Sequence, residues 1–213
     1  MADSYKPTQA EFDKIVIQHE MTVLLDQRPN RVLLFRKPKD MGTDYHFFIT
    51  TWPGHLAISG DGGTYVFARV DDMFEFFRGG TSAQAINPQY WGEKLQAIER
   101  NGGYREYDKK RFVDAITDTF NNWDFKDPNQ TVEAWKHIEE DLLDSEPESL
   151  EQAHQAAGAY TCPVTDQSFS EFWEHDLTDY TWRFIWACRA IKWAVGTYDA
   201  RTPEAKPDAP TTA

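Results

Sequence analysis

Apolar residues alternate with polar ones along the first third of the chain, which is the pattern of strands with one buried face. Each apolar run is short and ends at a turn signal that contains proline, glycine, asparagine or aspartate. The runs predict five strands, at residues 21–25, 31–35, 45–50, 55–59 and 64–70. Because the connections between them are short, we expect an antiparallel meander.

The clearest single signal is the segment from Thr50 to Arg69, in which two alternating runs flank Gly60-Asp61-Gly62-Gly63. Glycine reaches the positive φ angles that a tight turn needs. The segment therefore predicts a β-hairpin, and we expect Gly62 or Gly63 to hold a positive φ.

From Asp71 onward the spacing of the apolar residues changes from two toward 3.6, so helices should follow. They are expected at residues 73–78, 88–100, 108–122, 131–145, 149–159 and 179–198. A short helix with a capping box of Thr8 and Glu11 should precede the sheet. The last helix is apolar on most sides and should be central, with Trp186 in the core, unless its tryptophans form an exposed stripe for a partner or a second copy of the chain.

Together these elements predict an α+β fold in which an N-terminal antiparallel sheet of about five strands packs against a C-terminal helical region. Residues 1–70 should hold the leading helix and the sheet, and residues 71–200 an acidic helical region packed on it as one compact unit. Residues 201–213, which contain three prolines and no large apolar side chain, are expected to be a disordered tail.

Aromatic residues are concentrated in two of these helical segments, and their role is open. Phe74, Phe76 and Phe77 are near neighbours, so one short helix face cannot bury all three, and Tyr90 and Trp91 follow nearby. The group forms part of the core, or one member is exposed as an anchor for a protein interface.

The net charge of −13 is concentrated in one part of the chain. Between Asp114 and Tyr180 there are 17 acidic residues and two basic ones. Such a field repels nucleic acid and attracts basic protein surfaces. We therefore expect no direct nucleic-acid binding, and an exposed surface for a basic protein partner. The residues expected to form it are Glu139, Glu140, Asp141, Asp144, Glu146, Glu148 and Glu151.

Four residues would be the candidates if the chain were an enzyme or a nucleotide-binding protein: His46, His55, Asp61 and Arg69, along one edge of the sheet. The simpler interpretation is that His55 satisfies a turn hydrogen bond and that Asp61 stabilises the glycine-rich turn. The Gly-Asp-Gly-Gly sequence lacks the following helix and the Lys-Ser/Thr of a phosphate-binding loop. No nucleophile motif is present, so the sequence favours a protein without catalytic activity.

Several carboxylates and histidines have spacings that are compatible with metal binding. Glu133, His137 and Glu140 share one helical face, and Glu151 is three residues before His154, as in a di-iron bundle. The remaining ligands of such a centre are missing, and solvated acidic helix faces explain these residues. We therefore expect neither a metal nor a cofactor.

Compartment signals point to the cytoplasm. The chain has no uninterrupted apolar run long enough to span a membrane, and residues 1–13 lack the pattern of a secretory signal. Cys162 and Cys188 have no redox or metal-binding spacing and should be reduced.

Four blocks in order carry a family resemblance: TWPGHLAISGDGGTYVFAR, DMFEFFRG, INPQYWGEKLQAIER and TWRFIWACRAIKWAVGTYD. Together they make the chain similar to a widespread family of bacteriophage and prophage proteins of uncharacterised activity. The likeness is weakest from about residue 124 to residue 176. It implies a phage product acting in the host cytoplasm, such as an accessory or counter-defence factor, and it implies no catalytic residues.

Three functions from different classes follow. The leading hypothesis is a phage-encoded accessory protein that presents its acidic helices to a basic host protein, imitating the charge pattern of nucleic acid. The second is a small nucleotide-binding protein or enzyme that uses the His46, His55 and Asp61 edge. The third is an accessory of phage assembly.

Overall fold

The computed structural model describes residues 6–42, 44–80, 82, 84–100 and 102–201. The chain divides into two compact units. The sheet unit consists of Lys6–Asn101 together with the chain from Trp182 onward, and the helical unit is Gly102–Thr181.

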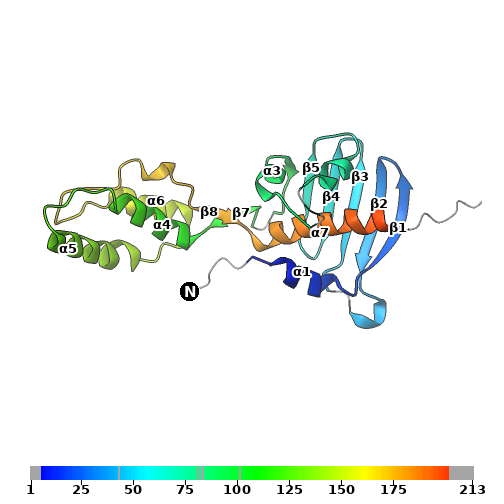
Figure 1. Ribbon diagram of the computed structural model, residues 1–213, viewed down its shortest axis with the longest axis horizontal. Helices are drawn as coiled ribbons and strands as arrows, with labels where there is room; N and C mark the ends of the chain where they lie inside the picture. The colour runs from blue at the N-terminus through cyan, green and yellow to red at the C-terminus, as the bar shows by residue number, and fades with distance from the viewer. Residues whose placement is uncertain (1–5, 43, 81, 83, 101, 202–213) are drawn as a thin grey trace, which may run out of the picture. The chain divides into compact units, whose positions relative to one another are not determined.

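An antiparallel sheet of six strands forms the base of the sheet unit, with the strands side by side in chain order (Figure 1). The strands are β1 (Glu20–Gln27), β2 (Asn30–Arg36), β3 (Phe47–Trp52), β4 (His55–Gly60), β5 (Tyr65–Ala68) and β6 (Leu95–Ala97). A short 3-10 turn, η1 (Lys39–Met41), lies between β2 and β3. The first five strands confirm the meander that the alternation predicts.

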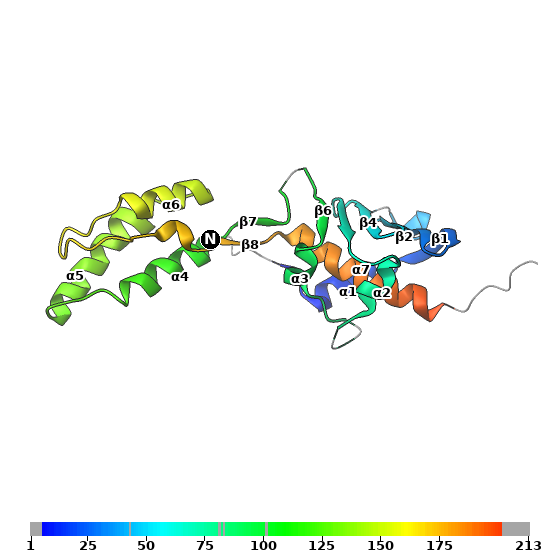
Figure 2. The same ribbon diagram turned by 90° about the horizontal axis from the view of Figure 1, so that it is seen from above.

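One face of this sheet is covered by helices. Figure 2 shows α1 (Gln9–Val16), α2 (Met73–Arg78) and α7 (Trp182–Ala200) on the same side of the strands. Every second residue along β2 to β5 is buried, including Leu33, Phe35, Phe47 and Ile49, whereas β1 and β6 contain no buried residue. The period of two in the sequence is thus the period of burial beneath the helices.

The C-terminal helix α7 is the centre of this core, as its sequence predicts. Trp186 is only 1% exposed, and its ring contacts Phe12 of α1 and Phe47 of β3, with ring centroids 6.0 and 5.4 Å away. Trp193 packs its ring edge against Phe35, with centroids 5.3 Å apart. Trp186 is therefore a core residue and not part of an exposed stripe.

Residues close together in the sequence determine where the first helix starts and how the central hairpin turns. Thr8 and Glu11 form the predicted capping box at the start of α1. In the turn between β4 and β5, Gly63 has a φ of +100°, which confirms the expectation of a positive φ at Gly62 or Gly63.

The expected helix at residues 88–100 is wrong over its second half. Only α3 (Pro88–Gly92) is helical, and Leu95–Ala97 instead forms β6, paired with Val66 and Phe67 of β5. The free edge of β5 offers these residues a hydrogen-bonding partner far away in sequence, which outweighs a local helical spacing.

The helical unit has its own core. It contains α4 (Lys109–Phe120), α5 (Pro128–Ile138), a π-helical turn η2 (Glu139–Leu143), α6 (Leu150–Ala159), a 3-10 turn η3 (Phe172–Glu174), and the paired strands β7 (Arg105–Tyr107) and β8 (Thr178–Tyr180). Its buried residues include Phe112, Ile116, Ile138, Leu142 and Phe172. Asp179 and Tyr180, expected at the start of the last helix, thus belong to β8 instead.

The structure divides the chain at other positions than the sequence analysis does. The helical unit is inserted between β6 and α7, and α7 belongs with the sheet. Of the predicted tail only Arg201 is described, and residues 202–213 lie outside the described residues. No helix in the described ranges has the length and the apolar character needed to cross a membrane.

Candidate protein-binding surface

The net charge of the protein is carried by the helical unit. Residues 102–181 contain 19 acidic and 6 basic residues, whereas the rest of the chain contains 16 of each. The difference within the helical unit equals the formal charge of the whole chain, −13. The residues outside 102–181 are therefore electrically balanced as a set, and the net charge of the chain is that of residues 102–181.

The seven carboxylates expected to bind a partner are all exposed on this unit. Three of them, Glu139, Glu140 and Asp141, lie on the π-helical turn that continues α5. Lys109 Nζ lies 2.6 Å from Glu146, and Lys136 Nζ lies 3.5 Å from Glu140. Exposed ion pairs of this kind contribute little to stability. The carboxylates therefore remain available to cations from outside.

An apolar groove of about 570 Å³ opens on the same unit, between α4 and α5. Phe120, Val132 and Trp135 give it apolar walls, and Val132 is 71% exposed. Glu139 also lines the groove, and its carboxylate accepts a hydrogen bond of 2.8 Å from Nε1 of Trp135. The groove thus joins exposed apolar side chains directly to the acidic turn, an arrangement typical of protein interfaces.

The structure separates the four residues of the alternative, enzymatic hypothesis into two pairs. Nδ1 of His46 lies 2.9 Å from the Asp61 carboxylate, which also accepts the backbone N–H of His46 at 3.2 Å. His55 lies at the other end of β4, where its ring stacks on Trp52 with centroids 5.1 Å apart. Arg69 is at that end too, because its backbone N–H donates to Gly54. The six residues of β4 separate the two pairs by about 16 Å.

Local structure accounts for both histidines in this region. His46 and Asp61 tie the start of β3 to the turn after β4, and Nδ1 of His55 lies 3.1 Å from the carbonyl oxygen of Pro53 in the preceding turn. His55 thus has the turn hydrogen bond that the simpler interpretation assigns to it, whereas the Asp61 carboxylate bonds to His46 and not within its own turn.

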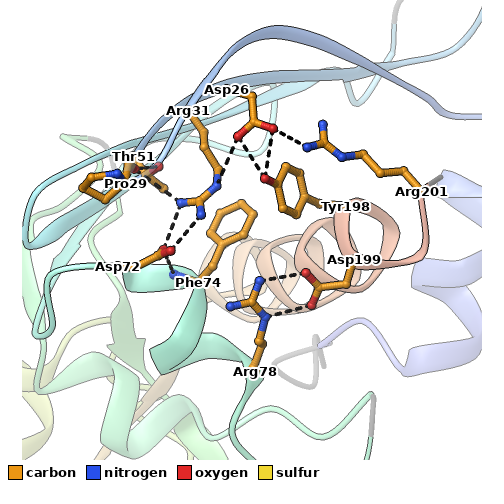
Figure 3. Close-up of polar contacts among 10 residues, drawn as sticks. All are labelled: Asp26, Pro29, Arg31, Thr51, Asp72, Phe74, Arg78, Tyr198, Asp199 and Arg201. Carbon is orange, nitrogen blue, oxygen red and sulfur yellow. Dashed lines mark hydrogen bonds and ion pairs between the residues drawn. The ribbon is translucent and has the colours of Figure 1, made fainter. Parts of the chain in front are cut away.

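The sheet unit also contains a charged cluster that the sequence analysis misses. The side chain of Arg31 is fully buried, and its guanidinium donates two hydrogen bonds, of 2.9 and 2.7 Å, to the carboxylate of Asp72 (Figure 3). The guanidinium also lies over the ring of Phe74, 4.4 Å from its centroid. Burial alone would lower the pKa of Arg31, but the bonds to Asp72 raise it overall, so the pair is ionised.

Around Arg31 the C-terminal end of α7 is tied to the edge of the sheet. Tyr198 donates a hydrogen bond of 2.9 Å to Asp26 of β1, and Arg201 also contacts Asp26. Asp199 forms a two-pronged pair with Arg78 of α2, at 2.7 and 2.9 Å (Figure 3). Every charged group drawn there has a protein partner. The cluster therefore stabilises the packing of α7 on the sheet and is not a binding site. The sequence pattern indicates that Arg31 is buried, because Arg31 occupies the same strand face as Leu33 and Phe35.

Most of the aromatic group of α2 and α3 belongs to the core. Phe74, Phe77 and Trp91 are buried in the core, whereas Tyr90 is exposed and Phe76 is half-buried beside it, with ring centroids 5.6 Å apart.

No group of three or more histidine, cysteine, aspartate or glutamate residues is placed to hold a metal ion in the part of the chain that the structure describes. Compared with protein-family models, curated proteins and solved structures, the chain matches none of them.

Proposed function

We propose that this chain is a non-enzymatic binding protein whose helical unit captures a basic amphipathic segment of another protein. The observation that carries the proposal is the apolar groove between α4 and α5, which lies within the unit that holds the whole net charge of the chain. In the proposed complex the helical unit binds the partner, and the sheet unit serves as a scaffold.

The groove and the carboxylates have separate tasks in this complex. The exposed side chain of Val132, beside Trp135 and Phe120, supplies apolar area that a partner's apolar face can cover. The surrounding carboxylates select a partner that carries lysine or arginine on its other face, and they raise the association rate at low salt. An amphipathic helix laid into an apolar groove is a common way to combine the two.

The resemblance to phage proteins supports a bacterial host protein as the partner. In that setting the basic segment is one that normally contacts nucleic acid, and the acidic helical unit competes for it. Blocking a host nucleic-acid-binding protein is the proposed counter-defence role. It requires no catalytic residue, in keeping with the separation of His46 and Asp61 from His55 and Arg69.

The direct test uses one substitution in the groove and a matched control. Val132→Glu places a charge at the groove without disturbing the core, because the side chain is already exposed. Ile17, which is 80% exposed on the sheet unit, gives the control variant Ile17→Glu. The probe is a synthetic 18-residue helix with leucine on one face and lysine on the other, and its binding is measured by fluorescence anisotropy. We expect Val132→Glu to weaken binding at least about tenfold and Ile17→Glu to leave it unchanged.

A pull-down from the bacterial host with the same variants identifies the natural partner. We expect one protein to be retained by the wild type and by Ile17→Glu, lost with Val132→Glu, and released by salt. A virion protein as that partner would support the assembly role instead. Equal retention by both variants would show that the groove is not the binding surface.

Charge reversal tests the acidic part of the surface separately. The triple variant Glu139→Lys, Glu140→Lys and Asp144→Lys should weaken binding and flatten its salt dependence. The same reversal at Glu20, Asp40 and Asp71, which are exposed on the sheet unit, is the control. If both triple variants behave alike, the helical carboxylates act only in solubility.

A further inference from the structure

A second candidate binding site lies in the sheet unit and is independent of the groove. A cavity of about 280 Å³ opens beside α7 and α1, and Asp13, Arg189, Lys192, Trp193 and Gly196 are among its lining residues. Two cations of α7 therefore line one small cavity, three residues apart on the helix.

The ammonium group of Lys192 is buried and has only neutral partners. The residue is 6% exposed, and its Nζ donates hydrogen bonds of 3.0, 3.1 and 2.8 Å to the carbonyl oxygens of Phe77, Arg78 and Gly79, where α2 ends. No carboxylate of the described residues lies within ion-pair distance of it. Burial lowers the pKa of Lys192, so the charged form is stabilised by carbonyl dipoles alone.

The guanidinium of Arg189 is in a similar position. Its Nε donates to the carbonyl oxygen of Pro7 at 2.9 Å, and its Nη1 donates to the amide oxygen of Gln9 at 2.6 Å. Nη2 makes no hydrogen bond to any residue that the structure describes. Asp13 accepts a hydrogen bond of 2.8 Å from Nε2 of Gln9. Burial lowers the pKa of Arg189, and the nearby charge of Asp13 offsets this only in part.

The lining thus has the features of an anion site. Two cations and one carboxylate line the cavity, so the lining carries one positive charge in excess. Nη2 of Arg189 can still donate a charge-assisted hydrogen bond to a carboxylate. The third feature is aromatic: Trp193 is fixed from behind by Phe35 and presents apolar surface to the cavity.

We propose that this cavity binds a small organic carboxylate, whose oxygens accept hydrogen bonds from Nη2 of Arg189 near the Lys192 ammonium and whose apolar body packs on Trp193. The bound anion offsets the desolvation of both cations, which the charge of Asp13 offsets only in part for Arg189. A monoanion with a flat apolar body fits the lining charge and the indole better than a phosphate dianion, which keeps more of its water.

Benzoate is the probe, titrated into the full chain and followed by calorimetry and tryptophan fluorescence. We expect saturable binding, with an affinity at least about tenfold lower in Arg189→Gln, because a charge-assisted hydrogen bond is removed. Inorganic phosphate is titrated in parallel. Phosphate binding tighter than benzoate binding would overturn the choice of a carboxylate.

Filling the cavity gives a test that does not touch either cation. A Cβ atom on Gly196 meets nothing within 4 Å, so Gly196→Leu places a side chain in the cavity mouth without a backbone clash, and it improves helix propensity. Gly158 on α6 is equally unobstructed, and Gly158→Leu is the matched control.

We expect Gly196→Leu to abolish benzoate binding while the protein stays folded, and Gly158→Leu to bind like the wild type. Equal binding by Gly196→Leu and the wild type would overturn the proposal, as would the absence of saturable binding at millimolar benzoate. Neither result depends on the groove of the helical unit. The experiments therefore test this site and the proposed partner surface independently.

Discussion

Gly62 lies directly against the indole ring of Trp186. A Cβ atom on Gly62 would be 2.4 Å from Cε3 of that ring, closer than any real side-chain contact. The glycine is therefore required by the approach of α7 to the hairpin turn, whereas the neighbouring Gly63 is favoured by its φ of +100°. One turn thus uses two glycines for two different physical reasons.

We predict that Gly62→Ala lowers the free energy of unfolding by about 1 to 3 kcal/mol, because the added methyl group must displace the Trp186 ring in a packed core. Gly196→Ala, which adds the same group to open space on α7, should raise it by about 1 kcal/mol. Urea denaturation followed by tryptophan fluorescence measures both. A neutral Gly62→Ala would mean that the turn moves away from α7 at little cost.

We predict that Trp186→Ala costs about 3 to 5 kcal/mol, since its ring is buried among Phe12 and Phe47. Trp173, which is 66% exposed on the helical unit, provides the control, and Trp173→Ala should stay within about 0.5 kcal/mol of the wild type. Thermal melting and size-exclusion chromatography separate packing from association. An unchanged melting temperature with an altered oligomeric state would contradict the core assignment.

We predict strong coupling between Arg31 and Asp72. Asp72→Asn keeps the helix cap on Phe74 but leaves the buried guanidinium with only the more distant carboxylate of Asp26, 3.8 Å from its Nε, at a cost of about 3 to 5 kcal/mol. The double variant Arg31→Met/Asp72→Asn should be more stable than the sum of the single changes implies, by about 0.5 to 3 kcal/mol. A double-mutant cycle in urea gives this value, and strict additivity would argue against the pairing.

The same network predicts how stability depends on pH. Burial alone would raise the pKa of Asp26 and of Asp72, but hydrogen bonds from Arg201 and Tyr198 to the first, and from Arg31 to the second, lower both below the ordinary value of 3.8. The pKa of Asp199 is lowered mainly by its hydrogen bond from Arg78. Because these pKa values are depressed by folding, the stabilisation is complete above 3.8 and is lost as the pH falls through the folded values.

The free energy of unfolding should therefore be flat with respect to these three groups at neutral pH and should decline below about pH 4. The measurement is a series of urea titrations between acidic and neutral pH. Asp72→Asn should have a shallower decline than the wild type, because one of the three groups no longer titrates. An identical slope would show that Asp72 does not contribute to the acid sensitivity.

Features with a local cause could be read from the sequence. The capping box of Thr8 and Glu11 and the alternation around the Gly60–Gly63 turn are fixed by neighbours in the chain, and both are present as expected. The helix expected at residues 88–100 was wrong at Leu95–Ala97 because β6 exists only through pairing with β5, which local spacing does not encode.

The candidate surface could be predicted only in part, for the same reason. Clustering of acidic residues predicted the exposure of Glu139 and its neighbours, which needs no knowledge of the fold. The groove could not be foreseen, because Phe120 and Val132 come from different helices and meet only after packing. Likewise Arg31 and Asp72 are 41 residues apart. The alternation in β2 places Arg31 on the buried face but does not indicate which carboxylate pairs with it.

The insertion of the helical unit sets the order in which the protein can be completed during synthesis. The strands β1 to β5 leave the ribosome first, but the helix that covers them begins at Trp182, about 110 residues after β5 ends. At typical elongation rates this is a delay of roughly 6 to 20 seconds, during which the apolar face of the sheet has no cover from α7. A nascent chain that stalls before Trp182 would therefore present Phe35, Phe47 and Ile49 to chaperones and proteases, even though its helical unit already has all the residues of its own core.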